Sequence, residues 1–153
     1  MPAKPARNFT PQMAKHLLNV VSDTYLLMIK THGYHWNVTG SLFPQLHALF
    51  NEQYTALFEA VDTIAERIRA LGIYAPGSTQ AFHMHTAVKE AGDKPPAAKA
   101  MLQDLLKSHE QVRVRIEEAR AFANEIEDSA SEDLMIERLR AHDKVIWMLR
   151  AQV

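Results

Sequence analysis

The chain has no cysteine among its 153 residues. A disulfide framework, a thiolate nucleophile and a cysteine-ligated metal are therefore excluded. Glycine is also scarce, with five residues, and β-branched residues rarely cluster, so the composition favours an all-α protein. The formal net charge is only −1, which gives the body of the protein no overall electrostatic attraction for nucleic acid or membranes.

Long apolar runs are lacking as well. The first residues are polar, without the apolar stretch of a signal peptide, and no later stretch reaches the length of a membrane span. We therefore expect a soluble, cytoplasmic protein. Because 47% of the residues are hydrophobic, the chain can form one sizeable core, and we predict a flexible tail over residues 1–9 and one domain over residues 10–153.

Four segments carry apolar residues at alternating spacings of three and four, which predicts helices packed in an antiparallel bundle. The first two end near Gly40 and Gly72, and the third follows Pro95 and Pro96. Residues 72–94 have weak periodicity and predict a long connection with one short helix, joining two helical hairpins. His109 and His142 lie on the apolar faces of the last two helices.

Two helix starts carry capping signals. Thr10 followed by Pro11 predicts an N-cap with proline at the first helical position. Ser129 with Glu132 three residues later predicts a capping box at the start of the last helix.

The second predicted helix has a polar stripe beside its apolar seam, where Phe50, Tyr54, Leu57 and Val61 recur. At about 100° per residue, the stripe residues fall within an arc of roughly 100°. They are His47, Asn51, Asp62 and Glu66. Carboxylates and neutral imidazoles suit Fe, Mn or Zn better than soft Cu(I), so the stripe predicts a metal-oxidising site.

One copy of this helix cannot close such a site. At about 1.5 Å per residue, His47 and Asp62 lie some 22 Å apart, whereas metal–ligand bonds are about 2 Å long. An antiparallel second copy across a two-fold axis places the histidine end of one chain against the acidic end of the other. The alternatives are a solvated face with salt bridges to Arg67 or Arg69, and histidines that are merely hydrogen-bonded core residues.

Three runs then resemble a known family. They are His35-Trp36-Asn37-Val38-Thr39-Gly40 followed by Phe43 and Leu46-His47, Asp62-Thr63-Ile64-Ala65-Glu66-Arg67 followed by Leu71-Gly72, and Asp143-Lys144-Val145-Ile146-Trp147. Together they are similar to the Dps family, the DNA-binding proteins from starved cells within the ferritin-like superfamily. The resemblance covers essentially the whole chain. It implies an all-α, ferritin-like four-helix bundle with a short extra helix in the crossover, assembled as a hollow homo-dodecamer.

The resemblance also implies ferroxidase sites at the dimer two-folds, where one chain supplies His35 and His47 and the other supplies Asp62 and Glu66. Iron would be oxidised there, preferentially by hydrogen peroxide rather than dioxygen, and stored as Fe(III). Zinc or manganese at the same site is the alternative. Trp36 would lie beside the site as a sink for stray oxidising equivalents, unless it only packs.

One position departs from the family pattern. Asn51 stands where the family usually has aspartate, and an amide oxygen lacks the charge that favours Fe(III), so we expect a weak second iron position. His32, one turn before His35, is a candidate extra ligand or an orienting residue. If Asn51 prevents turnover, the protein would be mainly a metal-binding shell or a DNA-binding, nucleoid-associated protein.

Two further pairs of charged residues are candidate functional residues. Glu132 and Asp133 would line a three-fold pore that attracts cations, or would only complement a helix N-terminus. Lys4 and Arg7 are the cationic side chains of the predicted tail. Repeated on twelve chains they would give weak, salt-sensitive DNA binding, with little left at physiological salt.

Overall fold

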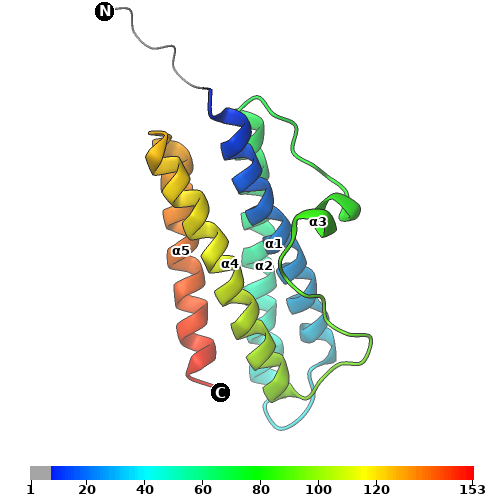
Figure 1. The fold of residues 1–153 in the computed structure, drawn as a ribbon. Coiled ribbons are helices and arrows are strands. Elements are labelled where there is room, and N and C mark those ends of the chain that lie inside the picture. The colour runs from blue at the N-terminus through cyan, green and yellow to red at the C-terminus, as the bar shows by residue number, and fades with distance from the viewer. Residues whose placement is uncertain (1–7) are drawn as a thin grey trace, which may run out of the picture.

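The protein, seen here in a computed structural model that describes residues 8–153, is a bundle of four long helices (Figure 1). One hairpin consists of α1 (Thr10–Asn37) and α2 (Phe43–Ala70), and the other consists of α4 (Ala98–Glu125) and α5 (Ser129–Arg150). The short helix α3 (Thr79–His85) lies in the connection between the hairpins. The predicted four-helix bundle with an extra crossover helix is confirmed.

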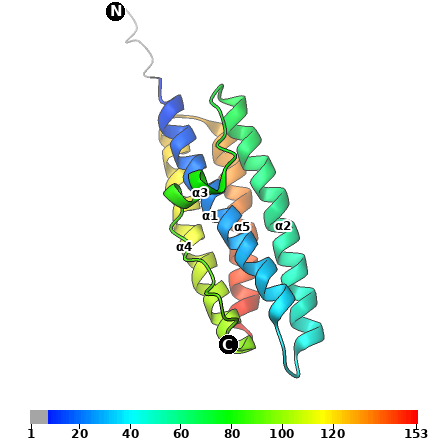
Figure 2. The same cartoon turned by 90° about the vertical axis from the view of Figure 1, so that its right-hand side faces the viewer.

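The crossover runs the length of the bundle, from the end of α2 to the start of α4 at the opposite end (Figures 1 and 2). As a result α2 and α4 point in the same direction. Around the bundle, α1 packs against α2 and α4, and α5 packs mainly against α4. Contacts between α2 and α5 are the sparsest of these pairs.

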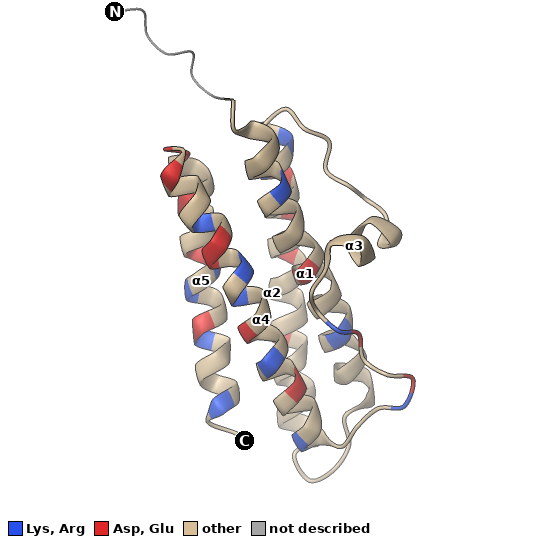
Figure 3. Ribbon diagram, viewed as in Figure 1, with Lys and Arg blue, Asp and Glu red and all other residues tan. Residues whose placement is uncertain are grey.

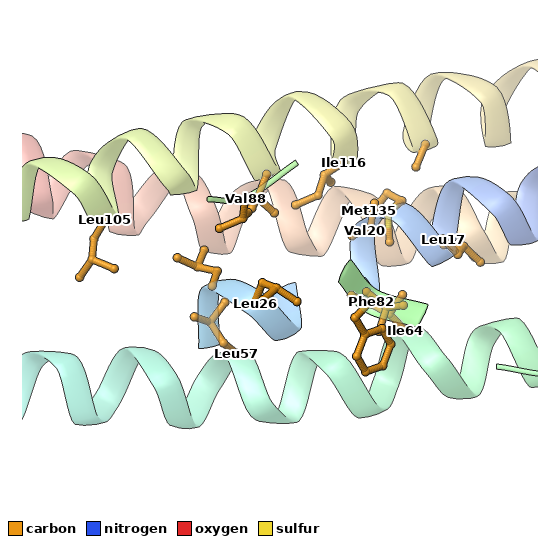
Figure 4. Close-up of a cluster of buried hydrophobic side chains, with 14 of the residues drawn as sticks. Leu17, Val20, Leu26, Leu57, Ile64, Phe82, Val88, Leu105, Ile116 and Met135 are labelled. Atoms are coloured by element: carbon orange, nitrogen blue, oxygen red, sulfur yellow. The ribbon is translucent and has the colours of Figure 1, made fainter. Parts of the chain in front are cut away.

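A single apolar core lies between the helices (Figure 4). The predicted seam of α2 enters it through Phe50, Leu57 and Ile64, whereas Tyr54 is only half-buried. Phe82 brings α3 onto the bundle, because its ring packs 4.6 Å from that of Tyr25. Within the described range, no helix is apolar over a length that could cross a membrane.

The crossover is fixed to the bundle by a buried carboxylate. Asp23 of α1 accepts hydrogen bonds from the Thr86 hydroxyl (2.8 Å) and the Ala87 amide (2.6 Å). Arg115 of α4 lies 3.5 Å from the other Asp23 oxygen and donates to the carbonyl of His85. Burial nevertheless raises the pKa of Asp23, since these partners only partly replace water.

Both predicted N-caps are wrong by one residue. Thr10 is already helical, the cap position is Phe9, and the Thr10 amide donates instead to Asn8 Oδ1 (3.1 Å). At α5 the cap is Asp128, whose Oδ1 accepts from the Ser131 amide (3.1 Å).

The carboxylate of Asp128 outcompetes the Ser129 hydroxyl because Arg67 of α2 holds it with a 2.8 Å ion pair. These bonds lower the pKa of Asp128 despite its partial burial. Glu132 is not part of a capping box, since its carboxylate pairs with Arg120 (3.1 Å).

Candidate metal site

The turn between α1 and α2 brings the two predicted histidine ligands together. His35 lies in the last turn of α1 and His47 in the second turn of α2. Gly40 has φ +106°, a left-handed conformation that L side chains rarely adopt and that this short turn requires. The two imidazole rings stack with centroids 3.8 Å apart and planes 19° from parallel.

Each histidine is oriented by the backbone of the other. His35 Nδ1 lies 2.8 Å from the carbonyl oxygen of His47, and His47 Nδ1 lies 2.8 Å from the carbonyl oxygen of His35. A carbonyl can only accept, so both Nδ1 atoms carry the proton. In the neutral rings both Nε2 atoms then keep a lone pair, which is the tautomer that binds a metal ion.

The end of α1 that carries His35 is held against α4 by a polar cluster. The buried Lys30 ammonium lies 3.1 Å from Asp104 and 3.0 Å from the Ser108 hydroxyl. Tyr34, next to His35, donates to Asp104 over 2.6 Å. Burial and this bond to a carboxylate raise the pKa of Tyr34, so its hydroxyl stays protonated and keeps donating.

A column of aromatic rings extends from the histidine pair. His32 lies between Trp36 and Tyr54, with ring centroids 4.0 Å and 4.1 Å away. Its ring is 6.1 Å from that of His35, and the Tyr54 ring is 5.3 Å from that of His35. Desolvation, and to a smaller extent His35, lowers the pKa of His32. Trp36 is 65% exposed, so its outer face is accessible in a single chain.

Asn51 is engaged by a residue whose role the sequence did not reveal. The Tyr54 hydroxyl donates to Asn51 Oδ1 over 2.9 Å, so a hydrogen already points at the oxygen that would bind iron. The sequence placed Tyr54 in the apolar seam. Its spacing of three residues from Asn51 on a helix was the signal available for this contact.

The predicted acidic ligands lie apart from the histidines. Asp62 and Glu66 are exposed, and neither forms an ion pair or side-chain hydrogen bond within residues 8–153. Arg67 binds Asp128 and Ser131 instead, and Arg69 stacks on the Tyr74 ring at 4.7 Å. In the described part of one chain, no group of three or more histidine, aspartate or glutamate residues comes together to hold a metal.

Acidic residues also gather around the turn from α4 to α5 (Figure 3). Glu132 is neutralised there by Arg120, with a further hydrogen bond from Asn124 (3.2 Å). Asp133 is exposed and lines the same surface recess as Glu66. Lys4 and Arg7, the predicted DNA contacts, lie outside the described residues.

Comparisons with known proteins agree with this architecture. Residues 14–153 match the ferritin-like domain family. The DNA protection during starvation protein of Brevibacillus brevis is 34% identical over 92% of this chain and 94% of its own length. Antigen TpF1 of Treponema pallidum is 32% identical over 98% of this chain and 85% of its own length.

Solved structures show the same fold over nearly the full length. The crystal structure of antigen TpF1 has a TM-score of 0.92 and covers 99% of this chain and 97% of its own. Dps from Vibrio cholerae, described as a member of a broad superfamily of ferritin-like diiron-carboxylate proteins, is 27% identical with a TM-score of 0.90 and 99% coverage of both chains. The chain therefore belongs to the Dps family of the ferritin-like superfamily.

Proposed function

We propose that this protein is a mini-ferritin that binds Fe(II) at sites shared between two chains, oxidises it and stores the Fe(III). Membership of the Dps family supports iron storage and DNA protection. Iron is the metal we propose, in preference to zinc or manganese, because the Vibrio cholerae relative is described as a diiron-carboxylate protein.

The reciprocal pairing of His35 and His47 carries this proposal. Both Nδ1 atoms are used by backbone carbonyls, so the two rings have no other tautomer that keeps these bonds. Two lone pairs are thereby fixed within one stacked pair before any metal arrives. A merely structural histidine pair has no need for both Nε2 atoms to remain available.

The remaining ligands are proposed to come from a second chain. Asp62 and Glu66 have no partner among the described residues of their own chain, and exposed carboxylates one turn apart suit a hard cation. An antiparallel α2 from the partner subunit would place them opposite His35 and His47, which gives two sites per dimer. Glu66 and Asp133 share a recess, so Asp133 is proposed to attract incoming cations.

The proposed reaction is 2 Fe²⁺ + H₂O₂ + 2 H₂O → 2 FeOOH + 4 H⁺. Each Fe(II) gives up one electron and the O–O bond of peroxide is broken, so both reactants of hydroxyl-radical chemistry are consumed together. Trp36 is proposed to intercept oxidising equivalents that leave the site. The ring of His32 contacts the rings of both Trp36 and Tyr54, and the ring of Tyr54 lies beside that of His35. A hollow dodecamer would hold the hydrated oxide.

A second candidate function follows from Asn51. With the Tyr54 hydroxyl donating to its oxygen, Asn51 offers little to a second iron ion. If only one iron binds per site, the two-electron reduction of peroxide slows, and the protein would act mainly as a metal-binding or DNA-covering shell. DNA binding by Lys4 and Arg7 is expected to be weak, and a gel shift that survives about 150 mM salt would contradict this.

The deciding experiment is anaerobic loading with Fe(II) followed by a pulse of peroxide, with the Fe(II) oxidised counted per peroxide. Glu66→Gln tests the acidic ligand, and Glu59→Gln is the matched control, an exposed glutamate on the same helix. We expect two Fe(II) per peroxide in the wild type and Glu59→Gln, and slow oxidation in Glu66→Gln. Oxidation no faster than in buffer, with iron bound, would favour the shell.

A further inference from the structure

A second histidine pair lies on the other helical hairpin, in α4 and α5. His109 of α4 and His142 of α5 are 1% exposed, and their Nδ1 atoms are 3.0 Å apart. Together with Gln53 and Arg138 they line a cavity of about 60 Å³ where α2 and α5 make few contacts. Apolar side chains, among them Leu57, form the rest of the wall.

Buried polar atoms without a partner concentrate at this cavity. Of the six buried side-chain nitrogen and oxygen atoms that lack a hydrogen bond in the described part of the chain, five belong to these four residues. They are Gln53 Nε2, Gln53 Oε1, His109 Nε2, Arg138 Nε and His142 Nε2. Buried polar groups are almost always paired, so a cluster of unpaired ones points to a bound occupant.

The chemistry of the pair limits what that occupant is. Burial lowers the pKa of His109 to about 3 and lowers that of His142 well below its usual range, so both rings are neutral at neutral pH. One Nδ1 donates to the other, which leaves one Nε2 with a lone pair and the other with a proton. The cavity therefore presents three donors, which are one imidazole N–H, the Gln53 Nε2 amide and Arg138 Nε, and two acceptors, which are Gln53 Oε1 and the other imidazole Nε2.

Among the residues that line the cavity only Arg138 is charged; its side chain is partly buried, and its Nε is fully buried. Arg138 makes no ion pair and no side-chain hydrogen bond within residues 8–153, and burial lowers its pKa, with the neighbouring Glu137 a smaller, opposing influence. Arg113, the other guanidinium that acts on His142, is already paired with Asp143. Only the Nε end of the Arg138 guanidinium is cut off from water, and with no carboxylate beside it this end favours an anion in the cavity.

We propose that this cavity is a binding site for a small monovalent anion of chloride size, held by Arg138 Nε, the Gln53 amide and one imidazole N–H. The volume leaves room for such an ion with roughly one water, which can donate to Gln53 Oε1 and to the imidazole Nε2 that has no proton. A divalent cation is disfavoured, because Arg138 repels it and only one Nε2 of the neutral pair has a lone pair to give.

Bromide is the probe that tests this site. Crystals of the assembled full-length protein are soaked in sodium bromide, and anomalous scattering is measured at the bromine edge. We expect a peak in the cavity within hydrogen-bonding distance of Arg138 Nε in the wild type and no peak in Arg138→Met. Arg140→Met removes an exposed arginine from the same helix and should keep the peak.

Thermal unfolding tests the same anion site in solution. Replacing gluconate by bromide at constant ionic strength should raise the thermal midpoint of the wild type and of Arg140→Met, and leave that of Arg138→Met unchanged. The proposal is overturned if the cavity contains only water at 0.5 M bromide, if the peak persists undiminished in Arg138→Met, or if a zinc soak places metal on His109 or His142.

Discussion

The molecule contains two histidine pairs whose hydrogen bonds give them opposite chemistry. His35 and His47 donate to backbone carbonyls, stack nearly parallel and lie half-buried at one end of the bundle. His109 and His142 bond to each other, tilt by 54° and are fully buried. The acceptor decides the difference, because a carbonyl leaves both Nε2 atoms bare, whereas an imidazole acceptor leaves only one.

The largest expected effect is on the rate of Fe(II) oxidation when a histidine of the terminal pair is replaced. His47→Ala removes one fixed lone pair and the stack on His35. It should slow Fe(II) oxidation by roughly 100-fold or more, since loss of a residue that only orients a ligand already costs about 10- to 100-fold. Stopped-flow absorbance of Fe(III) formation measures it.

His83→Ala is the matched control, because this histidine is exposed and, among residues 8–153, pairs only with Glu90 (3.5 Å). An oxidation rate within a factor of about two of the wild type is expected for the control. If His47→Ala oxidised iron as fast as His83→Ala, the terminal pair would not be the ferroxidase half-site.

The buried pair, His109 and His142, should make the free energy of unfolding fall as the pH is lowered. Its lowered pKa values mean that the unfolded state binds protons below about pH 6.5 that the folded state does not. The stabilisation is fully present above pH 6.5 and is lost as the pH falls toward 3. In halide-free buffer the free energy of unfolding should fall by about 1.4 kcal/mol per pH unit for each histidine.

Chemical denaturation between pH 7.5 and 5 measures that slope at one fixed protein concentration. His109→Asn should have a shallower slope than the wild type, and His83→Asn should not differ from it. Equal slopes in all three proteins would show that the buried pair does not govern acid stability.

Asn51→Asp sharpens the contrast at the terminal pair. A carboxylate keeps one oxygen for the Tyr54 hydroxyl and offers the other to iron, so the Fe(II) bound per chain at low loading should rise by about a factor of two. Anaerobic titration calorimetry counts the iron. Gln103→Glu adds the same charge on an exposed face of α4 and should leave the count unchanged; a count unaltered by Asn51→Asp would remove Asn51 as the limiting residue.

The smallest effect on rate is expected for Trp36→Phe. Trp36 packs against His32 rather than against the ligand pair, so iron oxidation should stay within about twofold of the wild type. Escape of hydroxyl radical should rise, which spin trapping during peroxide-driven oxidation detects. Trp147→Phe, at an equally exposed tryptophan of α5, is the control. Identical radical escape from all three proteins would leave Trp36 a packing residue only.

The helices could be predicted from the local spacing of apolar residues, whereas the pairing of His35 with His47 was predicted from the resemblance to the Dps family. The structure adds the physical reason for the pairing, since His35 and His47 flank one short turn that brings their rings together. The cap of α5 was predicted wrongly because Asp128 and Ser129 are equally good caps locally. An ion pair with Arg67, sixty-one residues away, decides between them.

Polar contacts between residues far apart in the chain could not be predicted from the sequence. His109 and His142 were predicted to face the core, and both are buried there. Their mutual hydrogen bond, and the convergence of Arg138 and Gln53 on one cavity, depend on how α2, α4 and α5 come together. The bond from Tyr54 to Asn51 was missed because Tyr54 was assigned to the apolar seam, where a hydroxyl carries no periodic signal.

The central claim is that each site combines the histidines of one chain with the acids of another, and co-assembly tests it most directly. One chain carries His35→Ala with His47→Ala, and the other carries Asp62→Asn with Glu66→Gln. Each alone should be inactive. In a 1:1 co-assembly about a quarter of wild-type ferroxidase activity should return, since half of random dimers are mixed and each has one intact site of two. Activity that stays at the background of the separate variants would contradict a site shared between chains.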